Sequence, residues 1–181
     1  KRSKFNKIGL FVSTSYLLLT LIFKWISFQE FKEGLQNQEI DYVEMDTKPS
    51  PLNAILWSSL IETDNGYRTA YYSLFDKKEI SYSKEFLKNH HLLKPYLEQK
   101  IVQQLINISA GWYRIEKENG KLLFWDLRFG QMGMDVDTAS FLWYYELNID
   151  KDGNISAIKR QPQIKNMSGM FSSLFHRVKG N

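Results

Sequence analysis

AILWSSLIETDNGYRTAYYSLFD, residues 54–76, is the stretch that decides the fold. Two runs rich in aromatic and aliphatic residues flank the turn sequence DNG, residues 64–66, which is a strong short-range signal for an antiparallel hairpin. Alternation along the first run places apolar side chains on both faces: Ile55, Trp57 and Ile61 on one, Leu56 and Leu60 on the other. Such a strand pair is expected to be covered on both sides.

Further strand signals lie on both sides of this hairpin. Runs with strand character occupy residues 40–47, 111–117, 122–129, 141–149 and 155–160. The turn sequences ENG and DKDG join the last four runs into two more hairpins. Pro49 and Pro51 break regular pairing after the first run. The sequence therefore predicts an antiparallel sheet of about seven strands.

Two amphipathic helices are expected to pack on this sheet. KPYLEQKIVQQLINI, residues 94–108, carries an apolar stripe that begins at Leu97, and Pro95 suits a first helical turn. MSGMFSSLFHRV, residues 167–178, repeats apolar residues with the helical period, and Gly180 stops it. The predicted fold class is α+β: an N-terminal helix, then a mostly antiparallel sheet domain with one or two packed helices.

The N-terminal segment is predicted to be a transmembrane helix. IGLFVSTSYLLLTLIF, residues 8–23, is apolar, and Trp25, Ile26 and Phe28 extend it to about the 20 residues that cross a hydrocarbon core. The basic flank KRSKFNK is expected to stay cytoplasmic, which sends the rest of the chain to the far side. The expected organisation is a span within residues 1–28, a helical stalk at 29–39 and an extramembrane domain at 40–181.

Two other interpretations of this segment were weighed. A cleaved signal peptide is disfavoured because no small-x-small cleavage site follows the apolar run. A buried core helix is disfavoured because the segment has no acidic face, which is unusual at this length. The chain begins with Lys1 rather than Met, so we expect it to be a piece of a longer protein.

Charge and composition exclude several function classes. Residues 1–28 hold five basic residues and no acidic one, whereas residues 29–181 hold 19 basic and 20 acidic residues. Because the folded part is nearly neutral, it lacks the basic surface of a nucleic-acid binder. The chain has no cysteine, which excludes a disulfide framework, a thiolate zinc site and a cysteine nucleophile.

Motifs for catalysis are missing from the sequence. The adjacent His90 and His91 diverge on a helix or a strand, so we do not expect them to share one metal ion, and His176 lies apart from them. No metal loop, phosphate-binding glycine run or Gly-x-Ser-x-Gly motif occurs. We therefore predict no catalytic and no metal-binding residue in this sequence.

FWDLRFGQMG, residues 124–133, offers a candidate ligand site. Asp126 and Arg128 lie on one side of the expected strand, and Tyr144 and Glu146 of the next strand are expected to lie across from them. These four side chains would form a polar patch suited to an anionic or sugar-like ligand. The alternative is an ion pair on an exposed sheet face, which contributes little to stability.

The order of several segments resembles the C-terminal part of a known family. KFNKIGLFVSTSYLLLTL, LQNQEIDYVEMDTKPSPLNAILW, YYSLFDKK, KNHHLL and FWDLRFGQMG follow one another as in bacterial membrane-bound metal-dependent hydrolases. This is the family of LexA-regulated or LexA-binding inner-membrane hydrolases, in its Bacteroidetes-type long form. PSPLN, residues 49–53, and DLRFG, residues 126–130, are the most specific parts of the resemblance, which covers nearly the whole chain.

The resemblance implies a polytopic N-terminal half that carries the His and Asp ligands of a divalent metal such as zinc. None of those ligand motifs is present here, so no catalytic residue can be carried over. It also implies that the chain resides in a bacterial inner membrane, with residues 29–181 in the periplasm, next to the N-terminal membrane part of the same protein.

Two functional hypotheses follow from these features. The first is a C-terminal extramembrane domain of a membrane-bound metal-dependent hydrolase. The second is a membrane-tethered domain that binds a ligand or a partner and has no catalysis of its own. An autonomous enzyme is disfavoured because no nucleophile or metal cluster can be found in the sequence.

Overall fold

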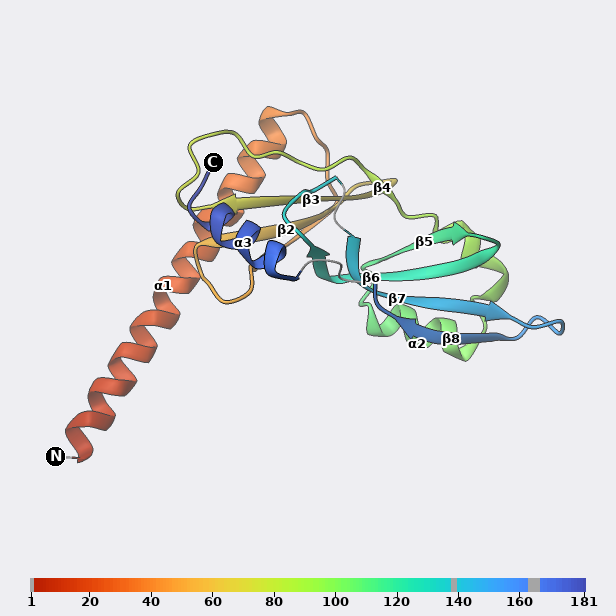
Figure 1. Cartoon of the computed structure of the whole chain (residues 1–181), viewed down its shortest axis with the longest axis horizontal. Coiled ribbons are helices and arrows are strands. Elements are labelled where there is room, and N and C mark those ends of the chain that lie inside the picture. Colours follow the sequence, from red (N-terminus) through yellow and green to blue (C-terminus); the bar gives the residue numbers. More distant parts are fainter. Residues whose placement is uncertain (1, 138–139, 163–166) are drawn as a thin grey trace.

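The computed structural model of the chain describes residues 2–137, 140–162 and 167–181. A long helix leads into two four-stranded antiparallel sheets, and further helices pack against each sheet (Figure 1). The predicted α+β class is therefore confirmed. The prediction of one sheet of about seven strands is wrong, because the described residues form two separate sheets of four strands.

The first sheet follows α1, Arg2–Asn37, and contains the hairpin around DNG. Its strands are β1 (Glu44–Pro49), β2 (Leu56–Glu62), β3 (Gly66–Ser73) and the short β4 (Phe86–Leu87), paired in that order. The second sheet contains β5 (Tyr113–Glu118), β6 (Lys121–Met132), β7 (Ser140–Ile149) and β8 (Ile155–Arg160), also in order. The three predicted hairpins are all present.

The β2–β3 hairpin is covered on both faces, as the sequence predicts. On one face Trp57 and Ile61 pack against the fully buried Phe31 of α1. On the other face Leu60 packs against Leu127 of β6. The C-terminal helix α3, Met167–Val178, covers the end of that second face and buries Leu174 against Leu56 and Tyr71.

The second sheet has a core of its own. The 3₁₀ helix η1, His90–Tyr96, and α2, Lys100–Ile108, bury Leu93 and Leu105 against Phe124. The sequence predicted one helix over residues 94–108, whereas the structure divides it. Gln99 is extended at the start of α2, with φ −76° and ψ 129°, and Pro95 lies inside η1, so the α-helical pattern begins only after Gln99.

α1 joins the predicted span and the predicted stalk in one unbroken helix of 36 residues. The side chains of residues 3–19 are exposed, whereas Ser27, Phe31 and Leu35 are fully buried against the first sheet. The first part is long and apolar enough to cross a membrane. Length and composition of this kind fit a membrane span and a signal sequence alike.

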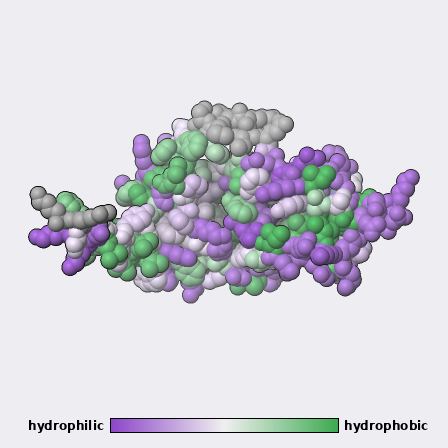
Figure 2. Space-filling model, turned by 90° about the horizontal axis from the view of Figure 1, so that it is seen from below, coloured by the Kyte–Doolittle hydropathy of each residue, from purple (hydrophilic) through white to green (hydrophobic). Residues whose placement is uncertain are grey.

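The two ends of the molecule differ in surface character. Seen from below, the far tip of the second sheet is hydrophilic (Figure 2), and this tip is the β7–β8 turn with Asp150, Lys151 and Asp152. Large apolar side chains are exposed along the opposite element, α1, including Phe5 at 71%, Leu10 at 69% and Phe11 at 74%. An exposed apolar surface of this length is typical of a segment that contacts a membrane or another protein.

Candidate functional site

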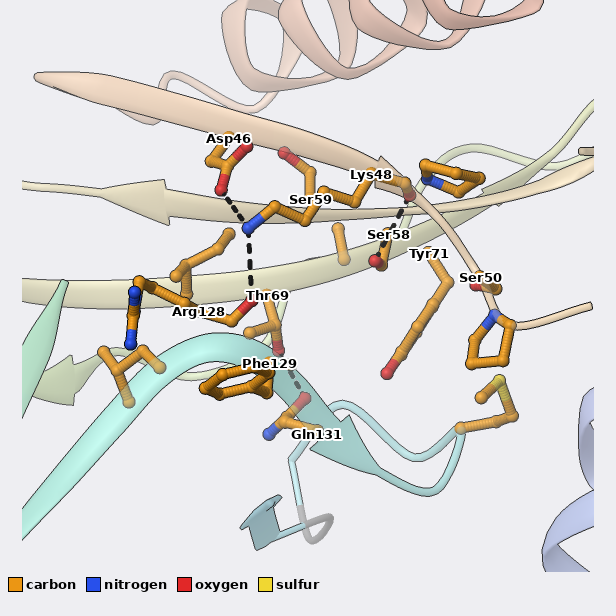
Figure 3. A pocket seen from close by; sticks show the side chains of 17 residues that line it. Asp46, Lys48, Ser50, Ser58, Ser59, Thr69, Tyr71, Arg128, Phe129 and Gln131 are labelled. Carbon is orange, nitrogen blue, oxygen red and sulfur yellow. Dashed lines mark hydrogen bonds and ion pairs between the residues drawn. The ribbon is translucent and has the colours of Figure 1, made fainter. Parts of the chain in front are cut away.

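A cavity of about 180 Å³ lies where the end of β6 crosses the first sheet (Figure 3). Side chains from β1, β2 and β3 form one wall, and residues 127–131 of β6 form the other. Its polar lining is rich in hydroxyl groups: Ser50, Ser58, Ser59, Thr69 and Tyr71. Leu60, Phe129 and Met134 supply apolar surface.

The cavity lies where the regular pairing of β6 with β7 is interrupted. β6 pairs regularly with β7 up to Asp126, and the register then shifts before it resumes at Gln131. Between these residues the strand bulges at Gly130, whose φ of +73° suits glycine. The bulged segment lies against the first sheet, where Thr69 Oγ1 donates a hydrogen bond of 2.8 Å to Gln131 Oε1.

An ion pair between Asp126 and Arg128 stabilises the start of this bulge. Arg128 donates to the carboxylate through Nε, at 3.0 Å, through Nη2, at 2.7 Å, and through its backbone N, at 3.2 Å. The ion pair of the alternative interpretation is therefore present, but Asp126 is only 2% exposed, so its carboxylate does not lie on an exposed sheet face. The hydrogen bonds with Asp126 raise the pKa of Arg128 above its ordinary value.

The expected patch of four side chains is not formed. Asp126 is paired with Trp143, and Trp125 with Tyr144, so Tyr144 and Glu146 lie on the opposite face of the sheet from Asp126. The sequence argument was off by one residue in register, and a shift of one residue reverses the faces.

Tyr144 and Glu146 have other neighbours on their own face. The Tyr144 ring centroid lies 4.6 Å from that of Trp125. Glu146 accepts a hydrogen bond of 2.5 Å from Lys121, and this contact lowers the pKa of Glu146. Neither residue lines the cavity, whereas Arg128 does. A ligand role for the four predicted residues stays a prediction.

Both cations of the cavity are paired with a carboxylate. Lys48 Nζ lies 2.5 Å from Asp46 Oδ2 and donates to the backbone oxygen of Arg128 at 3.1 Å. Arg128 is held by Asp126. Because each positive charge has a compensating negative charge beside it, the cavity offers little net attraction for an anion.

One buried hydroxyl of the lining has no partner. Ser50 is 5% exposed, and its Oγ makes no hydrogen bond with the described part of the chain. A buried hydroxyl without a partner is costly. Because Ser50 Oγ is shielded from solvent, a ligand or a water that bonds to it must first displace part of the lining. Tyr71 is satisfied instead: its hydroxyl donates to Gly133 O at 3.2 Å, and burial raises its pKa to about 12.

Sequence reasoning found Arg128 but missed the first wall of the cavity. Lys48, Ser50, Thr69 and Tyr71 show no pattern that marks a site, because they come from β1, the loop after it and β3, and they meet β6 only in the folded chain. One signal was available. PSPLN and DLRFG, the two segments singled out in the resemblance, both contribute to the lining.

The histidines do not gather at the cavity. His90 stacks on Tyr113, with ring centroids 4.0 Å apart, and its Nε2 lies 2.8 Å from Tyr113 O. Burial lowers the pKa of His90, which favours the neutral ring at pH 7. Within residues 2–137, 140–162 and 167–181, no group of three or more His, Asp or Glu side chains could hold a metal ion.

Comparison with known proteins does not extend this description. No family model matches the chain, and no curated protein and no solved structure matches it either.

Proposed function

We propose that the chain is a membrane-anchored binding domain whose cavity between the two sheets takes a small, uncharged, polyhydroxylated ligand such as a sugar. The observation that carries this proposal is the lining itself. It combines clustered hydroxyl groups, an unpartnered Ser50 Oγ and cations that are already neutralised. The exposed ring of Phe129 adds an apolar face on which a sugar ring can stack.

The membrane anchor in this proposal is the first part of α1. Its exposed apolar side chains have no cover within the domain, and lipid would supply one. The second part of α1 is buried in the first sheet, so the anchor and the domain form one continuous body.

Replacing Leu17 by arginine is expected to weaken membrane association. Leu17 is 60% exposed near the middle of the apolar segment, and an arginine at the centre of a span costs about 2.5–3.5 kcal/mol on insertion. The measurement is the fraction of protein that alkaline carbonate extracts from membranes. Leu97→Arg, at an exposed position of the folded domain, is the matched control and should leave that fraction unchanged. Equal extraction of both variants and the parent protein would contradict the anchor.

Replacing Ser50 by alanine is expected to weaken sugar binding. The loss of one neutral hydrogen bond corresponds to about 0.5–1.5 kcal/mol, or roughly a 2- to 12-fold loss of affinity. Calorimetry with the detergent-solubilised full chain, a panel of monosaccharides and inorganic phosphate measures this. Ser156→Ala, on β8 and away from the cavity, is the matched control. Binding of phosphate alone would indicate an anion site and contradict the proposal. Binding of neither the monosaccharides nor phosphate would also contradict the proposed sugar ligand.

The relation to membrane-bound metal-dependent hydrolases stays a prediction. The same holds for the divalent metal expected elsewhere in such a protein, for the inner membrane as the location and for a periplasmic domain. The metal ligands that the family implies are not residues of this sequence, so these predictions do not alter the role of the cavity.

A further inference from the structure

The loop between β1 and β2 presents a single leucine to the outside. Leu52 is 83% exposed, more than any other large apolar side chain among the described residues, including those of the apolar part of α1. Its φ of 64° lies in the left-handed region, which is unfavourable for leucine. A strained backbone that exposes an apolar side chain indicates a functional constraint at this position.

The loop is held rigidly in this conformation. Asn53 Oδ1 accepts hydrogen bonds from the backbone N of Ile55, at 3.0 Å, and of Leu56, at 2.7 Å. The Asn53 amide nitrogen donates to Pro51 O at 3.0 Å. Because the loop is fixed from within, little conformational entropy is lost when Leu52 binds a surface.

The loop lies next to the segment of α1 that leaves the domain. Trp57 Nε1 donates to Ala54 O, at 3.1 Å, and the same tryptophan belongs to the cluster against which Phe23 of α1 packs. In Figure 1 the loop projects from the first sheet on the side toward which α1 leaves the domain. Phe23 lies five residues before Phe28, where the predicted span ends, so the loop lies near that end of the span.

We propose that the β1–β2 loop is a second membrane contact, with Leu52 inserted among the lipid headgroups beside α1. This inference rests on the proposed membrane anchor, because α1 sets the height of the domain above the bilayer. Lys24 and Trp25, both exposed on α1 one and two residues after Phe23, are the residue types that favour the same interface. The contact would place the domain directly on the membrane surface, with Ser50 and Pro51 of the same loop lining the cavity.

Site-specific labelling tests this contact, because the chain has no cysteine of its own. Leu52→Cys, Leu17→Cys and Lys151→Cys are made in the full chain, labelled with an environment-sensitive fluorophore and reconstituted in phosphatidylcholine vesicles. Nitroxide lipids with the spin label at the headgroup or deep in the acyl chain then quench the fluorophore according to its depth. Leu17 marks the span, and Lys151 marks the hydrophilic tip of the second sheet.

The headgroup nitroxide is expected to lower the fluorescence of the label at position 52 at least twofold. The acyl-chain nitroxide is expected to quench the label at position 17. Neither nitroxide is expected to quench the label at position 151. Quenching at position 17 without quenching at position 52 would contradict the loop contact but would still support the membrane anchor. Quenching at neither 17 nor 52 would overturn the anchor together with the contact. Equal headgroup quenching at 52 and 151 would also overturn the contact, because it would show no preference for the loop.

Discussion

Replacing Phe31 by alanine is expected to lower the free energy of unfolding by about 3–5 kcal/mol. Phe31 is fully buried, and its ring meets that of Tyr72 edge to face, with centroids 6.1 Å apart. The backbone oxygen of the same residue accepts a hydrogen bond of 2.7 Å from Tyr82. A cavity at this point would loosen α1 from the first sheet, because Phe31 and Leu35 are the two fully buried apolar side chains of α1.

Denaturant titration in detergent measures this effect through tryptophan fluorescence, since Trp57 lies in the same cluster. Phe11→Ala is the matched control: it removes the same side chain from the same helix at a position that is 74% exposed. It should change the unfolding free energy of the domain by less than about 0.5 kcal/mol. A loss below about 1 kcal/mol for Phe31→Ala would show that α1 is not part of the cooperative core.

Replacing Asp76 by alanine is expected to cost about 3 kcal/mol and to release the C-terminal helix. Both carboxylate oxygens of Asp76 accept hydrogen bonds of 2.6 Å from Arg177, and Asp76 Oδ2 also accepts from Ser73 N at 2.9 Å. The side chain of Asp76 is 2% exposed and that of Arg177 18% exposed. Removing one partner leaves the other charge uncompensated in a largely dry environment, which is why the value approaches that of a buried pair.

A double-mutant cycle with Arg177→Met isolates the pair. The double variant should be more stable than Asp76→Ala alone, because it no longer buries an unpaired guanidinium. Hydrogen exchange of the α3 amides reports whether the helix detaches. Asp152→Ala, in the exposed β7–β8 turn, is the control for loss of an acidic residue. If α3 stays protected in Asp76→Ala, another contact holds it.

Local patterns predicted the elements, whereas their assembly depended on contacts that patterns do not encode. The hairpin around DNG, the apolar helix and the C-terminal helix all follow from turn chemistry and periodicity, which act within about a dozen residues. The division into two sheets was not predictable in this way. After β3 the chain runs through an irregular segment, the two-residue strand β4 and the helices η1 and α2 before β5 begins a new sheet.

The candidate site was predicted only in part, for the same reason. Asp126 and Arg128 are two residues apart, so their pairing follows from strand geometry. The bulge at Gly130 and the register that turns Tyr144 away depend on how β6 meets the first sheet. The other wall of the cavity lies about 60 to 80 residues earlier in the chain, as the Thr69–Gln131 and Lys48–Arg128 contacts illustrate.

Because α1 is one unbroken helix, the orientation of the domain relative to the apolar end of α1 is set by the helical phase between them. Each residue of an α-helix adds about 100° of rotation and 1.5 Å of rise. One residue inserted between Lys24 and Ser27 would therefore rotate the whole domain by about 100° about the helix axis, and four would return it to within about 40° of its original azimuth at about 6 Å greater height. Any torque or tilt applied to the apolar end is transmitted to the two sheets without a hinge to absorb it.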